Sequence, residues 1–317
     1  MKSIRIVTAA VAIAIVTIAA VVAARSDERA GYTATRRALD GIRPAHSAFS
    51  ATPGSVVGAY VPGVPNSVTP LTQFQSLTGT KLRVVMYYSG WGEPFQASFA
   101  AAVDNMHIIP LVQIDPDKVS LSEIADGDQD GYLVSYAQAV RLYGRAVIVS
   151  FGHEMNGDWF SWGYRRASPS EFIAAWQHIV TVFRSQGADN VTWLWTVNSI
   201  AGGGTRVANP DAWWPGSEYV TWAGVDGYYY RANETFTTLF GPTISDIRKV
   251  TRAPILIAET SAAPRIGQPA KIANLFAGVK ANHMLGLVWF DAKGNRDWRI
   301  DTPAAIAAFS RAANQLK

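Results

Sequence analysis

The chain has 317 residues, of which 49% are hydrophobic, and this is enough to bury the core of one large domain. Its formal net charge is +4 without any run of lysines and arginines, so it lacks the basic stripe of a nucleic-acid-binding protein. It contains no cysteine, so disulfides are excluded and the fold has to rely on its hydrophobic core.

The first 24 residues predict a targeting segment, because Lys2 and Arg5 precede an uncharged apolar stretch over residues 6–24. This stretch is longer than the usual core of a cleaved signal peptide and close to the length of a membrane-spanning helix. We therefore expect either an uncleaved anchor or a cleaved signal peptide, with the protein secreted or held on the outer side of the cytoplasmic membrane. Residues 25–54 are polar and interrupted by glycine and proline, which predicts a linker.

Eight short apolar runs follow, and we interpret them as β-strands whose starts are 26 to 45 residues apart. The segments between them have helical character; in residues 168–190, Ser168 and Glu171 predict a capping box and Pro169 suits the first helical turn. Alternating strands and helices predict parallel strands, and eight such units over residues 55–317 predict a single (β/α)8 TIM barrel. A doubly wound open sheet is the alternative, but no glycine-rich phosphate turn follows the first run. The runs begin near residues 56, 82, 108, 146, 191, 220, 255 and 286.

In such a barrel the functional residues lie at the carboxyl ends of the strands. Glu154 follows the fourth predicted strand and Glu259 belongs to the seventh, so both are expected to face the mouth of the barrel. Two carboxyl groups in one cleft are what glycosidic cleavage requires: one protonates the leaving oxygen, and the other attacks the anomeric carbon or activates water. The predicted strand ends carry Tyr60, Trp91, Asp115, His153, Glu154, Asn156, Asn198, Asp226, Tyr228, Glu259, Trp289 and Asp291.

The neighbours of the two glutamates predict different roles for them. A general acid needs a raised pKa, and Glu154 has the apolar side chains of Met155 and Trp159 close by in sequence. The second carboxylate has to stay ionised, and Tyr228 at the end of the sixth run is placed to donate a hydrogen bond to Glu259. We therefore predict that Glu154 is the acid and Glu259 the nucleophile.

Aromatic and amide side chains at the same strand ends predict a sugar-binding cleft. Indole rings stack on the C–H faces of sugars while their N–H groups remain free to donate hydrogen bonds. Packing is the more common role for any one tryptophan at such a position, but four at the same end of the barrel favour a cleft, so we expect Trp91, Trp159, Trp162 and Trp289 to line it. We also expect Asn198 to contact the substrate.

The stretch GHEMNGDWFSWG at residues 152–163 resembles the acid/base motif of family-26 glycoside hydrolases, which are retaining (β/α)8 enzymes with catalytic carboxylates on strands four and seven. The resemblance extends to DGDQDGYLVSYAQAVRLYG, WWPGSEYVTWAGVDGYYY, PILIAETSA and GLVWFDAKGNRDWRID. It implies that Glu154 is the acid/base and Glu259 the nucleophile. It further implies that His153 and Tyr228 orient the substrate and the nucleophile, and that Trp289 forms the floor of the subsite for the reacting sugar.

The same resemblance implies β-1,4-mannan as the leading substrate, with β-1,3-xylan and mixed-linkage β-glucan as alternatives, and no cofactor. Thr221 departs from the family pattern, which often has Asp there, and this difference bears on the substrate class. No metal site is predicted, because Gly157 stands where a His–Glu zinc motif needs its second histidine and Ala137 stands where a calcium loop needs a glutamate.

Two other functions stay open: a non-catalytic, cell-surface polysaccharide-binding protein on the same scaffold, and a hydrolase of the producer's own envelope glycan. In each case the expected partner is a polysaccharide, the protein is expected to be a monomer, and a membrane is involved only through the possible anchor.

Overall fold

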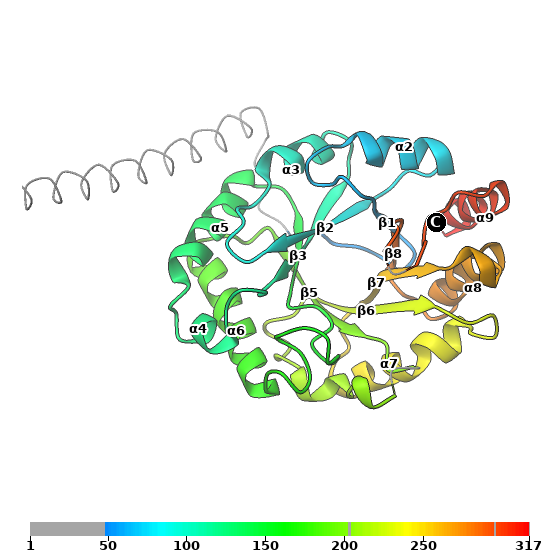
Figure 1. Cartoon of the computed structure of the whole chain (residues 1–317). Coiled ribbons are helices and arrows are strands. Elements are labelled where there is room, and N and C mark those ends of the chain that lie inside the picture. The colour runs from blue at the N-terminus through cyan, green and yellow to red at the C-terminus, as the bar shows by residue number, and fades with distance from the viewer. Residues whose placement is uncertain (1–47, 202–203, 295, 317) are drawn as a thin grey trace, which may run out of the picture. The chain divides into compact units, whose positions relative to one another are not determined.

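The computed structural model describes residues 48–201, 204–294 and 296–316. Within these ranges eight parallel strands form a closed barrel in the order β1 to β8, and Figure 1 shows helices surrounding the strands. The predicted TIM barrel is therefore confirmed, and each of the eight apolar runs contains one strand. The strands are β1 (Val56–Tyr60), β2 (Val84–Gly90), β3 (Ile109–Asp115), β4 (Val147–Phe151), β5 (Val191–Asn198), β6 (Trp222–Tyr229), β7 (Ile255–Ala262) and β8 (Gly286–Phe290).

Helices follow the strands and cover the outside of the barrel. The predicted capping box forms at the start of the helix after β4, where Ser168 and Glu171 bond to each other's backbone N–H groups and Pro169 occupies the first turn. The connection between β5 and β6 differs: its described residues form only the 3-10 turns Gly204–Arg206 and Pro210–Trp213. The helices are α2 (Thr69–Thr78), α3 (Ala97–Asp104), α4 (Leu121–Ala125), α5 (Asp130–Tyr143), α6 (Pro169–Ser185), α7 (Phe236–Val250), α8 (Gln268–Ala281) and α9 (Pro303–Gln315).

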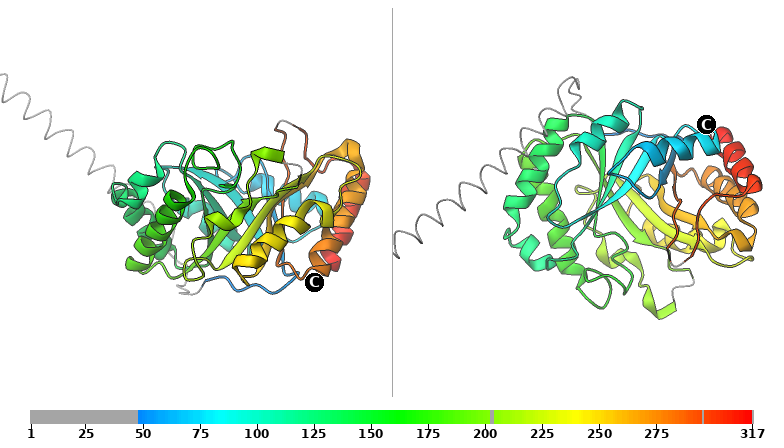
Figure 2. Two further views of the ribbon diagram at one scale, coloured as in Figure 1. Left: turned by 90° about the horizontal axis from the view of Figure 1, so that it is seen from below. Right: turned by 45° about the horizontal axis from the view of Figure 1, so that its top comes forward.

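Pairing between β1 and β8 closes the barrel, and the last helix completes the outer ring. Gly286 begins β8 with φ of 151°, and a Cβ atom at this position would lie 1.7 Å from the carbonyl oxygen of Val56, so only glycine permits this pairing. Figure 2 shows α9 beside α8 and near α2, which are the helices that it contacts. The two ends of the described domain are therefore held together.

Side chains alternate between the barrel interior and the helices along each strand. All eight strands contribute to the interior cluster, which includes Met86 of β2, Ala258 of β7 and Val288 of β8. This alternation decides which residues at the strand ends reach the mouth of the barrel.

The folded domain begins before residue 55, within the segment that the sequence predicts to be a linker. The ring of Phe49 is buried, with its centroid 5.4 Å from that of Trp222, and its backbone N–H donates to the hydroxyl of Thr192 at 2.9 Å. The Arg83 guanidinium lies 5.4 Å from the centre of the same ring. Because these partners lie at the amino-terminal ends of β2, β5 and β6, Phe49 closes the bottom of the barrel.

The predicted targeting segment, residues 1–24, and residues 25–47 of the predicted linker lie outside the described residues. Among the helices that are described, none is long and apolar enough to span a membrane.

Candidate active site

A cavity of about 710 Å³ opens at the carboxyl ends of the strands, and both Glu154 and Glu259 line it. Asn198 at the end of β5, Tyr228 in β6 and Arg296 after β8 form other parts of its wall. The two carboxylates predicted from sequence therefore share one cavity, at the end of the barrel where the fold places functional residues.

Glu154 lies in a tight turn after β4, with φ of 55°, a conformation that residues other than glycine rarely adopt. Its backbone N–H donates to the carbonyl of Thr196 in β5 at 3.0 Å, which ties the turn to the next strand. Trp159 Nε1 donates to Oε2 of Glu154 at 2.7 Å, and Asn198 Nδ2 donates to Oε1 at 2.5 Å. The carboxylate is thus fixed by two N–H donors, so its surroundings are more polar than the sequence predicts.

An irregularity in β7 turns Glu259 toward the cavity. Val225 and Asp226 are consecutive in β6, but they pair with Ile257 and Glu259 of β7, so Ala258 is an extra residue between them. Since Ala258 already faces the barrel interior, regular alternation would send Glu259 outward to the helices. The bulge therefore brings the second carboxylate into the active site.

Two tyrosine hydroxyls hold Glu259: Tyr88 of β2 donates to Oε2 and Tyr228 of β6 donates to Oε1. Burial and the nearby Glu154 carboxylate raise the pKa of Glu259, whereas His153 and the two tyrosine hydroxyls act in the opposite direction. Tyr228 was predicted as this partner, but Tyr88 was not. The alternation of β2, which puts Tyr88 on its inward face, would have identified it.

His153 supplies a cationic group beside the two glutamates. Its Nδ1 lies 2.9 Å from Oδ1 of Asp115, at the end of β3. Burial lowers the pKa of His153, but the carboxylates of Asp115, Glu154 and Glu259 outweigh burial and raise it to about 9. The imidazole is therefore protonated at neutral pH and donates to Asp115.

A third carboxyl group, Asp226 of β6, lies beside these residues and is fully buried. Neither of its oxygens has a hydrogen-bond partner among the described residues. Burial, together with the negative charges of Glu259 and Glu154, raises the pKa of Asp226 well above its usual range. Burial and the two neighbouring carboxylates thus favour the neutral form of Asp226, which does not itself line the cavity.

Of the four predicted tryptophans, Trp159 lines the cavity, with 37% of its surface exposed. Trp289 was predicted to form the floor of the reacting subsite, and this prediction is wrong. Its side chain is fully buried and lies 5.7 Å from the ring of Phe309 in α9. The reason is strand alternation: Val288 points into the barrel, so the next residue points outward.

Trp162 and Trp91 are also buried and do not line the cavity. Trp162 Nε1 donates to the carbonyl of His153 at 2.9 Å, and its ring stacks on Phe160 at 4.3 Å. Trp91 Nε1 donates to Gln129 Oε1 at 3.1 Å. Both residues therefore support the loops of the site instead of stacking on a sugar.

The tryptophan that packs against the site from the β8 side is Trp298, which was not predicted. Its ring centroid lies 4.7 Å from that of Tyr228 and 5.3 Å from that of Tyr230. It belongs to the DWRID part of the motif assigned to strand eight, nine residues after Trp289. Thr221 was expected to bear on the substrate, but it precedes β6 at the opposite end of the barrel, where its hydroxyl accepts from the N–H of Trp193.

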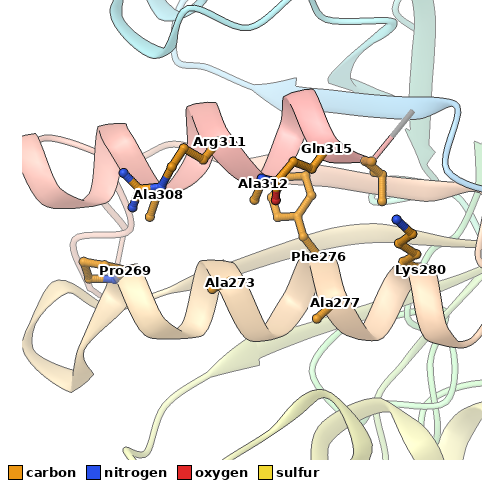
Figure 3. Close-up of a pocket in the computed structure, with 10 residues that line it drawn as sticks. Pro269, Ala273, Phe276, Ala277, Lys280, Ala308, Arg311, Ala312 and Gln315 are labelled. Carbon is orange, nitrogen blue, oxygen red and sulfur yellow. The ribbon is translucent and has the colours of Figure 1, made fainter.

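A second hollow, of about 360 Å³, lies on the outer wall of the barrel between α8 and α9 (Figure 3). Ala273 and Ala277 of α8 face Ala308 and Ala312 of α9 there. Its lining contains no acidic residue, so the cavity at the strand ends is the candidate active site. Over the described ranges, no group of three or more His, Cys, Asp or Glu side chains is arranged to hold a metal ion.

Comparison with known proteins gives a family match and two similar relatives. The sequence profile of glycosyl hydrolase family 26 matches residues 132–309. Endoglucanase H of Acetivibrio thermocellus is 32% identical over 277 residues, which are 82% of this chain and 30% of that protein. A mannan endo-1,4-β-mannosidase of Bacillus subtilis is 29% identical over 156 residues, 46% of this chain and 37% of that protein. The chain thus spans about a third of the length of each of these relatives.

Solved structures share the fold. A modular endo-β-1,4-mannanase from Cellulomonas fimi superposes with a TM-score of 0.62 at 17% identity, covering 88% of this chain and 74% of the other. The family-26 domain of an endo-β-mannanase/endo-β-glucanase from Prevotella bryantii superposes with a TM-score of 0.59 at 13% identity, covering 83% of this chain and 90% of the other.

Proposed function

The chain belongs to glycosyl hydrolase family 26, and from this membership we propose that it hydrolyses β-linked polysaccharide with retention of the anomeric configuration. The observation that carries the proposal is the different setting of two glutamates in one cavity. Glu259 accepts hydrogen bonds from two tyrosine hydroxyls, whereas Glu154 accepts from the indole of Trp159 and the amide of Asn198. A pair of carboxyl groups with separate supports suits two separate roles.

In the first step Glu154 protonates the glycosidic oxygen while Glu259 attacks the anomeric carbon and forms a glycosyl-enzyme ester. In the second step Glu154 takes a proton from water, which displaces Glu259 from the same face that the leaving group occupied. The tyrosine hydroxyls keep Glu259 ionised and aimed before the attack. The His153 imidazolium offsets the repulsion between the two glutamates.

We take β-1,4-mannan as the leading substrate and β-glucan as the second candidate. The mannan proposal is supported by the names of the Bacillus subtilis relative and of the Cellulomonas fimi structure. The glucan candidate is supported by the relative of higher identity, which carries the name endoglucanase.

A non-catalytic polysaccharide-binding protein would require only the cavity. A hydrolase of envelope glycan would require that its substrate be made by the same organism that makes the protein. Both donors to each carboxylate are in place, and this favours a catalytic site over a binding surface alone. Action outside the cytoplasm remains part of the proposal and rests on the apolar residues 6–24. A monomeric state is likewise still a proposal.

The experiment that tests this function measures release of reducing sugar from mannans, β-glucans, xylans and envelope glycans by the full chain and by Glu154→Gln and Glu259→Gln. We expect hydrolysis of a mannan or a β-glucan and its loss in both variants. Binding to a glycan without hydrolysis by the unmodified protein would support the binding-protein alternative.

A further inference from the structure

Three arginines line the active-site cavity, and they differ in their ionic partners. Arg206 is paired with Asp158 at 2.8 Å, and Arg231 is paired with Glu234 at 3.5 Å. Arg296, in the loop after β8, forms no salt bridge with any residue that the structure describes. It is half-buried and is one of the residues that line the cavity.

An aromatic ring fixes this guanidinium in place. The Arg296 Cζ atom lies 4.9 Å from the centroid of Tyr230, which also lines the cavity and is 40% exposed. Tyr230 packs edge-on against Trp298, which in turn packs against Tyr228, the partner of the nucleophile. The ring and the cation thus form one surface, named here the Tyr230–Arg296 platform.

The platform lies near the reacting groups. Burial raises the pKa of Tyr230, and the charges of Glu154 and Glu259 raise it further, whereas the Arg296 charge acts against them. A sugar stacked on the exposed ring would therefore be close to the sugar that reacts. A neutral sugar can be bound by the ring and hydrogen-bond donors alone, whereas a guanidinium without an ionic partner among the described residues is suited to an anion on the substrate.

We propose that the Tyr230–Arg296 platform binds a sugar unit carrying a carboxylate, and that the preferred substrate is a β-mannan or β-glucan whose chain includes such acidic units. The inference rests on the proposed function, because the acidic unit belongs to the chain that the two glutamates cleave. The planar guanidinium matches a carboxylate with two parallel N–H···O bonds, while the tyrosine ring takes the C–H face of the same sugar.

The test compares kcat/KM of the full chain on three polymers at low ionic strength. The first is a soluble β-1,4-glucomannan, the second is the same polymer with some C6 hydroxyls oxidised to carboxylates, and the third is its carboxymethyl ether. We expect an acidic polymer to be cleaved about tenfold better than the neutral one, with the advantage reduced in 0.5 M NaCl (roughly 4 Å of screening length). Preference for the oxidised polymer identifies a uronic acid, and preference for the ether identifies a pendant carboxylate.

Two variants separate the platform from a general charge effect. Arg296→Gln should lower the ratio of acidic to neutral kcat/KM about tenfold. Arg265→Gln removes the same charge from an exposed position after β7 that does not line the cavity, and it should leave the ratio unchanged. A ratio of one or below in the unmodified protein, or equal ratios in both variants, would overturn the inference while hydrolysis itself upheld the proposed function.

A binding measurement keeps the inference testable if no polymer is cleaved. Calorimetry with the Glu154→Gln variant would compare a neutral and a C6-oxidised oligosaccharide, with and without Arg296→Gln. Tighter binding of the acidic ligand that depends on Arg296 would support the platform even if the proposed function failed. Equal affinity for the two ligands would contradict it.

Discussion

Replacing Tyr88 by phenylalanine removes one of the two hydroxyl donors to Glu259 and leaves the ring that lines the barrel interior. The nucleophile has to be ionised to attack, and the lost hydrogen bond stabilises the ionised form. The substitution should therefore raise the pKa of Glu259 above its value in the unmodified enzyme, where burial and Glu154 already raise it. The acidic limb of the pH profile of kcat/KM then moves to higher pH.

The size of this movement follows from the kind of bond that is lost. A hydrogen bond to a charged group contributes about 1.5–3 kcal/mol, and about 1.36 kcal/mol corresponds to one pKa unit. The limb should therefore shift upward by roughly one to two pH units, and kcat/KM on the acid side should fall about 10- to 100-fold. The assay is kcat/KM for the best substrate between pH 3 and pH 9.

Tyr87→Phe provides the matched control, because the adjacent residue faces outward and packs on Phe99 of α3 with ring centroids 5.6 Å apart. It should leave the acidic limb in place. Tyr228→Phe removes the other donor and should move the limb in the same direction as Tyr88→Phe. A limb that stays fixed or moves to lower pH in Tyr88→Phe would refute the role given to the two hydroxyls.

Three further predictions concern the corrected positions and the cationic histidine. Trp298→Leu should lower kcat/KM at least about tenfold, because Tyr228, which donates a hydrogen bond to Glu259, would lose the ring that it packs against. Trp289→Leu should instead lower the free energy of unfolding by about 3 kcal/mol with kcat/KM within about threefold of the unmodified enzyme, and equal losses of activity in both variants would contradict the assignment. Phe49→Ala should lower the free energy of unfolding, measured in urea, by about 3 kcal/mol. An unchanged free energy of unfolding would mean that residues 48–54 belong to the linker and not to the folded domain. His153 has a folded pKa of about 9, above its unfolded value, so its stabilising effect is complete below about pH 6.5 and is lost as the pH rises through 9. Asp115→Asn should therefore lower stability by about 1–2 kcal/mol at pH 6 and by less at pH 10, and an equal loss at both pH values would exclude this coupling.

The fold could be predicted because the information lies in short segments of sequence. Each strand is a buried apolar run, and each interval is long enough for a crossover. The capping box at Ser168 depends on three neighbouring residues, so it too is readable from sequence. The burial of Phe49 was missed because its contacts are with residues far along the chain, such as Thr192.

The site could be predicted in outline, since the carboxylates, His153, Tyr228 and Asn198 follow from their places at strand ends. The positions of the tryptophan rings were harder to predict, because a ring at a strand end faces either the cavity or the helices. Trp289 faces the helices because of strand alternation, and applying that rule to Val288 would have shown it. The bulge at Ala258 is different: it turns Glu259 inward against the alternation and depends on the pairing of β7 with both neighbours. No local sequence pattern predicts this bulge.

The most direct test of the proposed mechanism is the stereochemistry of azide rescue in alanine variants of the two glutamates, on an aryl β-glycoside with a good leaving group. With Glu154→Ala the glycosyl-enzyme still forms on Glu259, and azide then attacks from the face of the departed group, so the product is the β-glycosyl azide. With Glu259→Ala azide takes the place of the nucleophile and gives the α-glycosyl azide. We predict these two products with rate increases in both variants. A β-azide from Glu259→Ala, or an α-azide from Glu154→Ala, would contradict the assignment of acid/base and nucleophile.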